Sequence, residues 1–209
     1  MMNRGLLLVL SGPSGAGKGT VCEAYKCRHE NIWTSVSMTT RAPRKGEVEG
    51  ESYYFVTVEE FERKIANDEF LEYAQVYGNY YGTPRAQVEE KIAQGRDVIL
   101  EIDIQGALNV QENTSEGIFI FILPPSMNEL KKRIIGRGSE TPESLLTRFQ
   151  SAYNEINYVS KYNYAITNHT VEQAAHDLAC IVRAEKCRVT RVSNEILSLK
   201  EEDLNELID

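Results

Sequence analysis

The 209-residue sequence has no long run of hydrophobic residues and no stretch of low complexity. Its N-terminal apolar run, Leu6 to Leu10, is too short for a signal peptide or a membrane span. Basic residues are also scarce, because 23 Lys and Arg face 31 Asp and Glu, a net charge of −8. These deficits argue against membrane attachment and against broad binding to nucleic acid. Any polyanion that this protein handles is expected to be held locally, by clustered arginines.

Paired cysteines are absent as well. The four cysteines contain no C-x-x-C pair and all lie on predicted helices: Cys22, Cys27, Cys180 and Cys187. This pattern is typical of reduced, partly buried thiols and predicts a cytoplasmic location. With 42% hydrophobic and 26% charged residues, the composition is that of an ordinary globular protein. The length suits one compact unit carrying insertions better than two independent domains.

The stretch from Leu6 to Thr20, LLLVLSGPSGAGKGT, joins the apolar run to a glycine-rich turn and a helix-compatible segment. The order of strand, G-x-x-x-x-G-K and helix is typical of a phosphate-binding loop, and seven matching positions argue against an incidental turn. Such a loop directs backbone N–H groups and the positive end of a helix at phosphate oxygens. We predict that it binds a nucleotide through Gly12, Pro13, Ser14, Gly15, Ala16, Gly17, Lys18, Gly19 and Thr20.

The loop departs from the usual pattern at one position. The residue after the lysine is ordinarily Ser or Thr, which meets magnesium, whereas here it is Gly19, and Thr20 follows one place later. The sequence leaves open whether Thr20 or a water molecule held by the backbone fills the metal role.

A second apolar stretch, RDVILEIDIQG, predicts a buried strand through Ile104 that carries the carboxylates Glu101 and Asp103. An apolar strand that ends in an acid commonly accompanies a phosphate loop, because the acid can hold magnesium through water. This strand therefore predicts an acid beside the magnesium ion of the loop. The family resemblance described below implies that this acid is Asp103, with Thr20 as the candidate ligand from the loop.

Strand and helix patterns alternate along most of the chain. Strands are predicted at residues 6–10, 32–37, 98–104, 117–123 and 163–168, and helices at 58–70, 83–95, 126–138, 139–162 and 171–188, besides the one after the loop. Ser126 is the expected N-cap of its helix. This alternation predicts an α/β fold with a doubly wound, mostly parallel sheet whose ligand lies at the carboxyl ends of the strands. The acidic tail is either a packed helix or a frayed terminus.

Several stretches together resemble the guanylate kinase family, which phosphorylates GMP with ATP. They are SGPSGAGKGT, SVSMTTRAPRKGEVEGESYYFV, FLEYAQVYGNYYGTP, ILEIDIQG and KKRIIGRGSETPESLLTR, in family order. The resemblance implies a single domain comprising a core (about 1–34, 84–125 and 149–190), a β-rich GMP-binding insertion (about 35–83), a helical lid (about 126–148) and a C-terminal tail (about 191–209).

The resemblance also assigns the acceptor site. It implies that Arg41, Arg44, Tyr53 and Tyr81 hold the GMP phosphate, for which guanidinium forks and phenols are suitable donors. It implies that Ser37, Glu72 and Thr83 recognise the guanine base, with Gly82 beside them. It also implies that Glu101 contacts the acceptor nucleoside. A carboxylate can accept from both N1–H and N2–H of guanine, whereas adenine would leave it unpaired.

The lid supplies Arg133, Arg137 and Arg148, which the resemblance makes catalytic. The alternative for Arg133 and Arg137 is a solvated charged face with glutamate partners. Near adenine the family usually carries Asn-Asp, and here the pair is Asn168-His169, so only Asn168 is assigned to ATP.

The expected partners are ATP, GMP and Mg²⁺, without nucleic acid or membrane, in a monomer, homodimer or higher homo-oligomer. Two competing interpretations remain. One is a kinase for AMP, CMP or UMP, against which Ser37 and Glu72 argue. The other is a guanylate-kinase-like module that binds phosphopeptides, against which the intact Lys18 argues.

Overall fold

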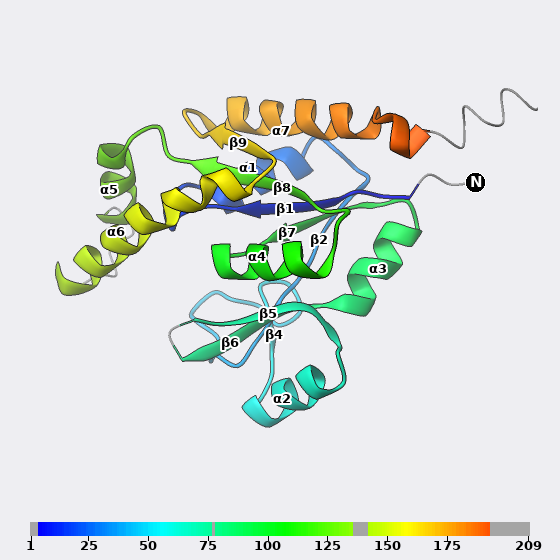
Figure 1. Ribbon diagram of the computed structural model, residues 1–209. Helices are drawn as coiled ribbons and strands as arrows, with labels where there is room; N and C mark the ends of the chain where they lie inside the picture. The colour runs from blue at the N-terminus through cyan, green and yellow to red at the C-terminus, as the bar shows by residue number, and fades with distance from the viewer. Residues whose placement is uncertain (1–3, 77, 136–141, 193–209) are drawn as a thin grey trace, which may run out of the picture.

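The computed structural model describes residues 4–76, 78–135 and 142–192, which form two β-sheets flanked by helices (Figure 1). The strands are β1 (Leu7–Ser11), β2 (Ile32–Thr34), β3 (Met38–Thr39), β4 (Tyr54–Phe55), β5 (Phe70–Val76), β6 (Asn79–Pro84), β7 (Asp97–Glu101), β8 (Ile118–Leu123) and β9 (Tyr164–Thr167). The helices are α1 (Lys18–Lys26), α2 (Val58–Ala66), α3 (Arg85–Ala93), α4 (Ile104–Asn113), α5 (Met127–Ile135), α6 (Pro142–Ile156) and α7 (Val171–Lys186), with a 3₁₀ turn η1 (Asn157–Lys161).

The central sheet has five strands in the order β2-β7-β1-β8-β9, and all of its pairs are parallel. The strand β1 lies in the middle of the sheet, so its carboxyl end lies between those of β7 and β8. Its residue Leu10 pairs with Glu101 on one side and with Ile120 on the other. This register brings the end of β7 beside the glycine loop that follows β1.

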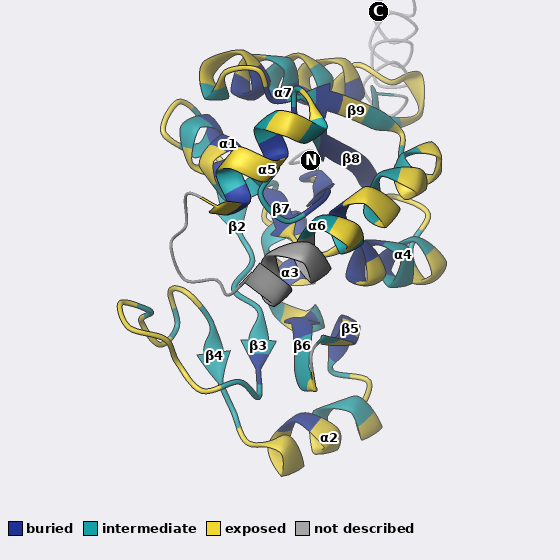
Figure 2. Ribbon diagram, turned by 90° about the vertical axis from the view of Figure 1, so that its left-hand side faces the viewer, coloured by how far each residue is buried: buried dark blue, intermediate teal, exposed yellow. Residues whose placement is uncertain are grey.

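Alternation along β1 divides the core into two layers. Leu8 and Leu10 point to the face covered by α1 and α7, whereas Leu7 and Val9 point to the face covered by α3 and α4. All four are buried, as expected for a parallel sheet with helices on both faces. Figure 2 shows the buried strands between the two helical layers. The predicted mostly parallel α/β fold is confirmed.

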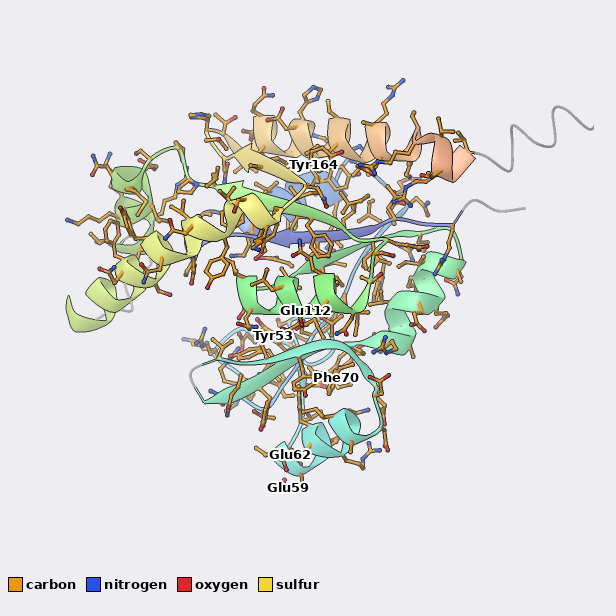
Figure 3. The ribbon with its side chains drawn as sticks, in the orientation of Figure 1. Tyr53, Glu59, Glu62, Phe70, Glu112 and Tyr164 are labelled. Atoms are coloured by element: carbon orange, nitrogen blue, oxygen red, sulfur yellow. The ribbon has the colours of Figure 1, made fainter. Side chains whose placement is uncertain are left out.

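The second sheet is formed by residues 38–84 in the order β4-β3-β6-β5. Its strands β5 and β6 form an antiparallel hairpin, and α2 covers one face by stacking Phe61 on Phe70 at 4.4 Å and on Tyr80 at 5.1 Å. The second sheet also contacts α4, where the Asn109 side chain donates to the carbonyl of Tyr73 over 2.7 Å. Figure 3 shows Tyr53 on the side of this sheet near α4, while Glu59 and Glu62 of α2 lie at the far end of the molecule.

Some predicted boundaries were wrong. The strand expected to run through Ile104 ends at Glu101, and a helix that the sequence analysis did not predict, α4, begins at Ile104. Asp103 is therefore an N-cap, whose carboxylate accepts from the backbone N–H of Gly106 over 2.8 Å. The strand expected over 32–37 ends at Thr34. The Ser126 cap is confirmed, because its hydroxyl accepts from Glu129 N over 3.1 Å.

The four cysteines are unpaired thiols, as predicted, but only Cys22 is buried, whereas Cys27, Cys180 and Cys187 are exposed. The expected tail helix lies outside the described residues. Within the described ranges, no helix combines the length and the apolar character that crossing a membrane requires.

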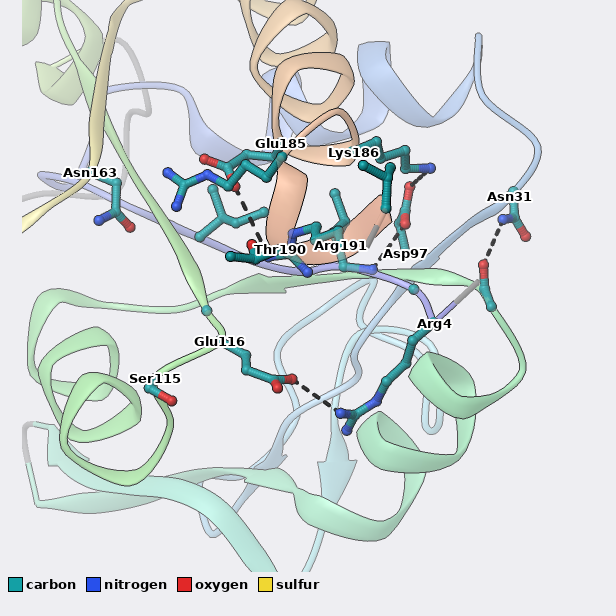
Figure 4. Close-up of a pocket in the computed structure, with 17 residues that line it drawn as sticks. Arg4, Asn31, Asp97, Ser115, Glu116, Asn163, Glu185, Lys186, Thr190 and Arg191 are labelled. Carbon is teal, nitrogen blue, oxygen red and sulfur yellow. Dashed lines mark hydrogen bonds and ion pairs between the residues drawn. The ribbon is translucent and has the colours of Figure 1, made fainter. Parts of the chain in front are cut away.

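At the amino ends of the central strands, charged side chains connect α7 to the sheet (Figure 4). The Asp97 carboxylate is 2% exposed, accepts from the backbone N–H of Leu6 over 3.0 Å and pairs with Lys186 Nζ over 2.6 Å. In the same region Arg4 and Glu116 form an ion pair whose two side chains are each 64% exposed. The two pairs differ mainly in burial, which makes them a matched comparison.

We expect Asp97→Ala to lower the free energy of unfolding by about 2 kcal/mol, because it leaves the buried Leu6 N–H without an acceptor. The exposed control Glu116→Ala is expected to change it by less than about 1 kcal/mol. Urea unfolding followed by circular dichroism measures both. Equal effects of the two substitutions would contradict a structural role for the buried carboxylate.

Candidate nucleotide-binding site

The glycine loop leaves the carboxyl end of β1 and turns into α1 at Gly17. Gly17 has φ +93°, in the left-handed region that favours glycine, and serves as the helix N-cap. A Cβ at this residue would lie 2.4 Å from Nδ2 of Asn168. The loop therefore needs glycine here both for its backbone angle and for the side chain that packs against it.

Lys18 folds back over the loop from the first turn of α1. Its Nζ donates to the carbonyl of Gly12 over 2.7 Å and lies 3.4 Å from that of Pro13. Burial lowers the pKa of Lys18 from its usual value, while the carboxylates of Glu101 and Glu155, among other groups, oppose this effect. The ammonium group of Lys18 is thus held at the loop, where it can bind an anion.

Gly19, which stands where phosphate loops ordinarily carry Ser or Thr, lies close to a neighbouring side chain. A Cβ built on Gly19 would lie 3.3 Å from each of the two carboxylate oxygens of Glu101, tighter than ordinary contact. The missing side chain gives Glu101 room beside the first turn of α1. The Thr20 hydroxyl donates to the carbonyl of Gly17 over 2.7 Å, which leaves its oxygen able to accept or to bind a cation.

The outer wall of the loop is formed by Asn168, after β9, and by Arg133 of α5. The Asn168 side chain is buried and donates from Nδ2 to the carbonyl of Ala16 over 2.8 Å. Arg133 donates to the carbonyls of Ala16 and Asn168 over 3.4 and 3.3 Å and to Glu129 over 3.4 Å. Arg133 thus has both the predicted position at the loop and the glutamate partner of the alternative interpretation.

A cluster of polar side chains lies on the second sheet. Arg41 donates from Nε to the hydroxyl of Tyr81 over 3.2 Å, and its guanidinium carbon lies 5.4 Å from the ring centre of Tyr53. The rings of Tyr53 and Tyr81 meet edge to face with centres 5.9 Å apart. The structure therefore brings together three of the four residues assigned to the acceptor phosphate.

Glu47 occupies the fork of Arg41, and the sequence analysis did not single it out. Its carboxylate accepts from both terminal nitrogens of Arg41 over 2.8 and 3.1 Å and from the backbone N–H of Arg44 over 2.7 Å. The hydrogen bonds from Arg41 and Arg44 lower the pKa of Glu47. The only signal in the sequence is its position six residues after Arg41, on the same loop.

Glu72 of β5 and Thr83 of β6 form a buried polar pair. Glu72 is 5% exposed, Thr83 is fully buried, and the threonine hydroxyl donates to Oε1 of Glu72 over 2.6 Å. Burial raises the pKa of Glu72 to about 7, opposed by the Thr83 hydrogen bond and reinforced by the charge of Asp103. The neighbouring Gly82 leaves room for Phe61 and Phe70, since a Cβ there would lie 2.9 Å from both rings.

The two sheets meet at the N-terminus of α4. A Cβ on Gly106 would lie 2.8 Å from Oε2 of Glu72 and 3.3 Å from Oδ1 of Asp103. Glu72 therefore approaches the acidic end of the central sheet although it belongs to the other sheet. Ser37 lies in the segment that connects β2 of the central sheet to β3 of the second sheet, and its carbonyl accepts from Tyr54 N over 2.9 Å.

Two predicted residues are not described in full. Arg137 lies outside the described residues, and so does the side chain of Arg148. A residue that the sequence analysis missed, Glu155 of α6, is among the carboxylates that act on Lys18. No local pattern identifies it, because it is separated from the loop by more than a hundred residues.

The fold and the loop define the class of protein. A parallel sheet that carries a glycine loop, a lysine folded over that loop and a helix N-terminus beneath it is a P-loop nucleotide-binding fold. A family model described as Guanylate kinase matches residues 4–185 of the chain. The chain belongs to the guanylate kinase family.

Individual relatives agree over nearly the whole chain. It is 66% identical to the guanylate kinase of Clostridium acetobutylicum over 99% of this chain and 98% of that protein. It is 63% identical to the guanylate kinase of Clostridium tetani over 98% of each. The crystal structure of guanylate kinase from Anaplasma phagocytophilum is similar with a TM-score of 0.76 and 38% identity, over 93% of this chain and 94% of that one.

The raised pKa of Glu72 predicts a pH-dependent effect on stability. The folded-state pKa of Glu72 lies above its unfolded value, so the contribution of Glu72 to the free energy of unfolding is most favourable below about pH 4.5 and falls as the pH rises through 7. Glu72→Gln removes the buried charge and keeps an oxygen for Thr83. We expect it to raise the free energy of unfolding by about 1–3 kcal/mol at pH 8 and by less at pH 5.

Urea unfolding of both proteins at the two pH values measures this difference. Glu69→Gln, an ion-paired glutamate in the loop just before β5, is the control for a general charge effect. An identical change at pH 5 and pH 8 for Glu72→Gln would show that the carboxyl group does not titrate between them.

Proposed function

We propose that the protein transfers the γ-phosphoryl group of ATP to GMP, giving ADP and GDP. The observation that carries this proposal is the coexistence of an intact phosphate loop with the buried Glu72–Thr83 pair on the second sheet. The first provides a site for the donor triphosphate, and the second provides a site that can read an acceptor base. Membership of the guanylate kinase family supports the same pairing of substrates.

The donor triphosphate lies along the loop from Gly12 to Thr20. Backbone N–H groups and the N-terminus of α1 bind its oxygens, and Lys18 exchanges its bond to the Gly12 carbonyl for the outer phosphates. Asn168 and Arg133 support the loop through the Ala16 carbonyl. Arg133, Arg137 and Arg148 neutralise charge as the phosphoryl group moves.

The acceptor phosphate binds at the cluster on the second sheet. Arg41, Arg44, Tyr53 and Tyr81 supply guanidinium and phenol donors. Glu47 holds Arg41 in position through its two short hydrogen bonds. Since Tyr53 and Tyr81 pack against each other, the phenols are fixed before the substrate arrives.

Guanine is recognised by Glu72, with Ser37, Gly82 and Thr83 around it. The Thr83 hydroxyl occupies one oxygen of Glu72, so the carboxylate remains oriented while it accepts from N1–H and N2–H of guanine. Adenine has an unprotonated N1 and no 2-amino group, so it would leave the buried carboxylate unpaired. Glu101 faces the acceptor nucleoside.

Mg²⁺ fits the oxygen donors at the loop. The Thr20 hydroxyl and the Asp103 carboxylate are hard ligands of the kind that Mg²⁺ prefers, with phosphate oxygens completing the shell. Among the described residues, no three His, Cys, Asp or Glu side chains are grouped to hold a metal ion without substrate. When bound, the ion neutralises charge on the transferring phosphate.

Catalysis consists of alignment and charge neutralisation. The attacking oxygen belongs to a phosphate that is already anionic, so no strong general base is needed. Closure of the second sheet toward the loop excludes water, which would otherwise accept the phosphoryl group.

The free thiols support a reducing compartment such as the cytoplasm.

An acceptor panel tests the proposal. With Mg²⁺ and ATP, we expect kcat/KM for GMP to exceed that for AMP, CMP and UMP by at least about 10³, because none of these bases presents the adjacent ring N–H and amino N–H donors with which guanine satisfies Glu72. Coupled detection of ADP gives the rates. Comparable turnover of AMP and GMP would disprove the base assignment, and failure to bind ATP in isothermal titration would favour a phosphopeptide-binding module.

Substitution of the loop lysine tests the donor half. We expect Lys18→Ala to lower kcat by at least about 10²-fold, because the ammonium stabilises charge that develops as the phosphoryl group moves. Lys26→Ala at the other end of α1 removes a half-buried lysine that is paired with Glu23, and it is the matched control. A kcat unchanged by Lys18→Ala would show that the loop is not catalytic.

A further inference from the structure

A hollow of about 550 Å³ lies between the C-terminal end of α1 and the helix α7. Two histidines and two cysteines are among the residues that line it: His29, His176, Cys180 and Cys187. None of the described residues that line it belongs to the glycine loop or to the proposed acceptor site. Imidazole and thiolate are the ligands that zinc and softer metal ions prefer in proteins. The hollow therefore has the ligand types of a transition-metal site outside the nucleotide-binding region.

His176 and Cys180 stand four residues apart on α7 and so share one face of the helix. The Sγ of Cys180 lies 3.6 Å from Nε2 of His176. In a tetrahedral zinc site, Zn–N bonds of about 2.0–2.1 Å and Zn–S bonds of about 2.3 Å place two such ligand atoms about 3.6 Å apart. The pair thus already has the separation that a shared tetrahedral ion requires.

The helix fixes this spacing. On its inner face α7 packs Leu178 and Val182 into the core against α1, whereas His176 and Cys180 are exposed. An ion can therefore reach both ligand atoms without any part of the helix unfolding. Ligands that are ordered before binding also lose less conformational entropy when the ion arrives.

The charges around the hollow do not oppose a divalent cation. Two cations line it, Arg183 and Lys186, and so do two carboxylates, Glu30 and Asp97, so that their formal charges cancel. Lys186 is itself paired with Asp97 over 2.6 Å. Among the described residues no three His, Cys, Asp or Glu side chains are grouped as metal ligands. Water must therefore complete the coordination, as in zinc sites that keep an open position.

We propose that Nε2 of His176 and Sγ of Cys180 bind one Zn²⁺ ion, with water in the remaining positions. As the bond between sulfur and zinc forms, the Cys180 thiol releases its proton to solvent. The site is separate from the proposed Mg²⁺ position at the loop, where hydroxyl and carboxylate oxygens suit a harder ion. Zinc binding here does not depend on phosphoryl transfer from ATP to GMP.

Titration calorimetry of the nucleotide-free full chain with Zn²⁺ tests the site, in excess Mg²⁺ to occupy sites made of oxygen ligands. We expect Cys180→Ser and His176→Ala each to raise the Kd for Zn²⁺ by at least about tenfold, because each removes one of two protein ligands. Both side chains are exposed, and circular dichroism checks that the variants fold. No zinc binding by the unsubstituted protein, or binding that neither substitution weakens, would overturn the proposal.

The same hollow supplies the matched controls. Cys187→Ser and His29→Ala remove a thiol and an imidazole that line it but lie outside the pair. We expect either substitution to change the Kd for Zn²⁺ by less than about twofold, because the ion keeps both of its protein ligands. A loss as large as that of Cys180→Ser would contradict the assignment of the ligands to α7 residues 176 and 180.

Co²⁺ alone, added in place of Zn²⁺, identifies the sulfur ligand by absorption spectroscopy. A thiolate bound to Co²⁺ gives a charge-transfer band in the near ultraviolet. We expect this band in the unsubstituted protein and in Cys187→Ser, its loss in Cys180→Ser, and a weaker band in His176→Ala at the same Co²⁺ concentration. A band that persists in Cys180→Ser would show that another cysteine is the ligand and would refute the site.

Discussion

The parallel pairing of β1 with β7 sets Leu10 opposite Glu101, and the two halves of the site are built around that register. Because the strands run in the same direction, the glycine loop and the acidic end of β7 emerge at the same edge of the sheet. The distance between them is short enough that a side chain at residue 19 would press on Glu101. Gly19 is therefore an adaptation of the loop to its neighbouring strand, and Thr20 remains available at the next position.

A second consequence of this edge is electrostatic. Lys18 loses hydration at the loop, yet Glu101, Glu155 and Asp103 act in the direction that retains its charge. Burial raises the pKa of Glu72, and the charge of Asp103, one of these acids, adds to the effect. A ligand that brings positive potential or N–H donors to this region relieves that cost. In the proposed reaction, the guanine base supplies such N–H donors to Glu72.

Local patterns in the sequence predicted the parts of the site that are contiguous in the chain. The loop, the buried strands and the Ser126 cap depend on residue types at short spacing, and all are present. The end of β7 was misjudged because Ile102 and Ile104 continue the apolar pattern after the chain has turned. Only the three-dimensional position of Asp103, capping α4, reveals that the strand has ended.

Partnerships across long stretches of chain were not predictable in the same way. Glu155 reaches the loop only because α6 folds back over the sheet, and Asn168 reaches Ala16 across 152 residues. The approach of Glu72 to α4 depends on how the second sheet docks, which no local pattern encodes. The resemblance to a family supplied Glu72 and Asn168, whereas Glu47 and Glu155 required the structure.

In the proposed acceptor site, the pairing of Arg41 with Glu47 affects how the phosphate of GMP is bound. A free guanidinium would lose rotamer entropy on binding an anion, whereas Arg41 is already fixed by Glu47 and Tyr81. The neighbouring carboxylate of Glu47 reduces the attraction of Arg41 for phosphate. The pairing therefore favours binding by fixing the geometry of the guanidinium and not by increasing its charge. Binding energy is then available to bring the second sheet toward the loop, because less of it is consumed in ordering the site.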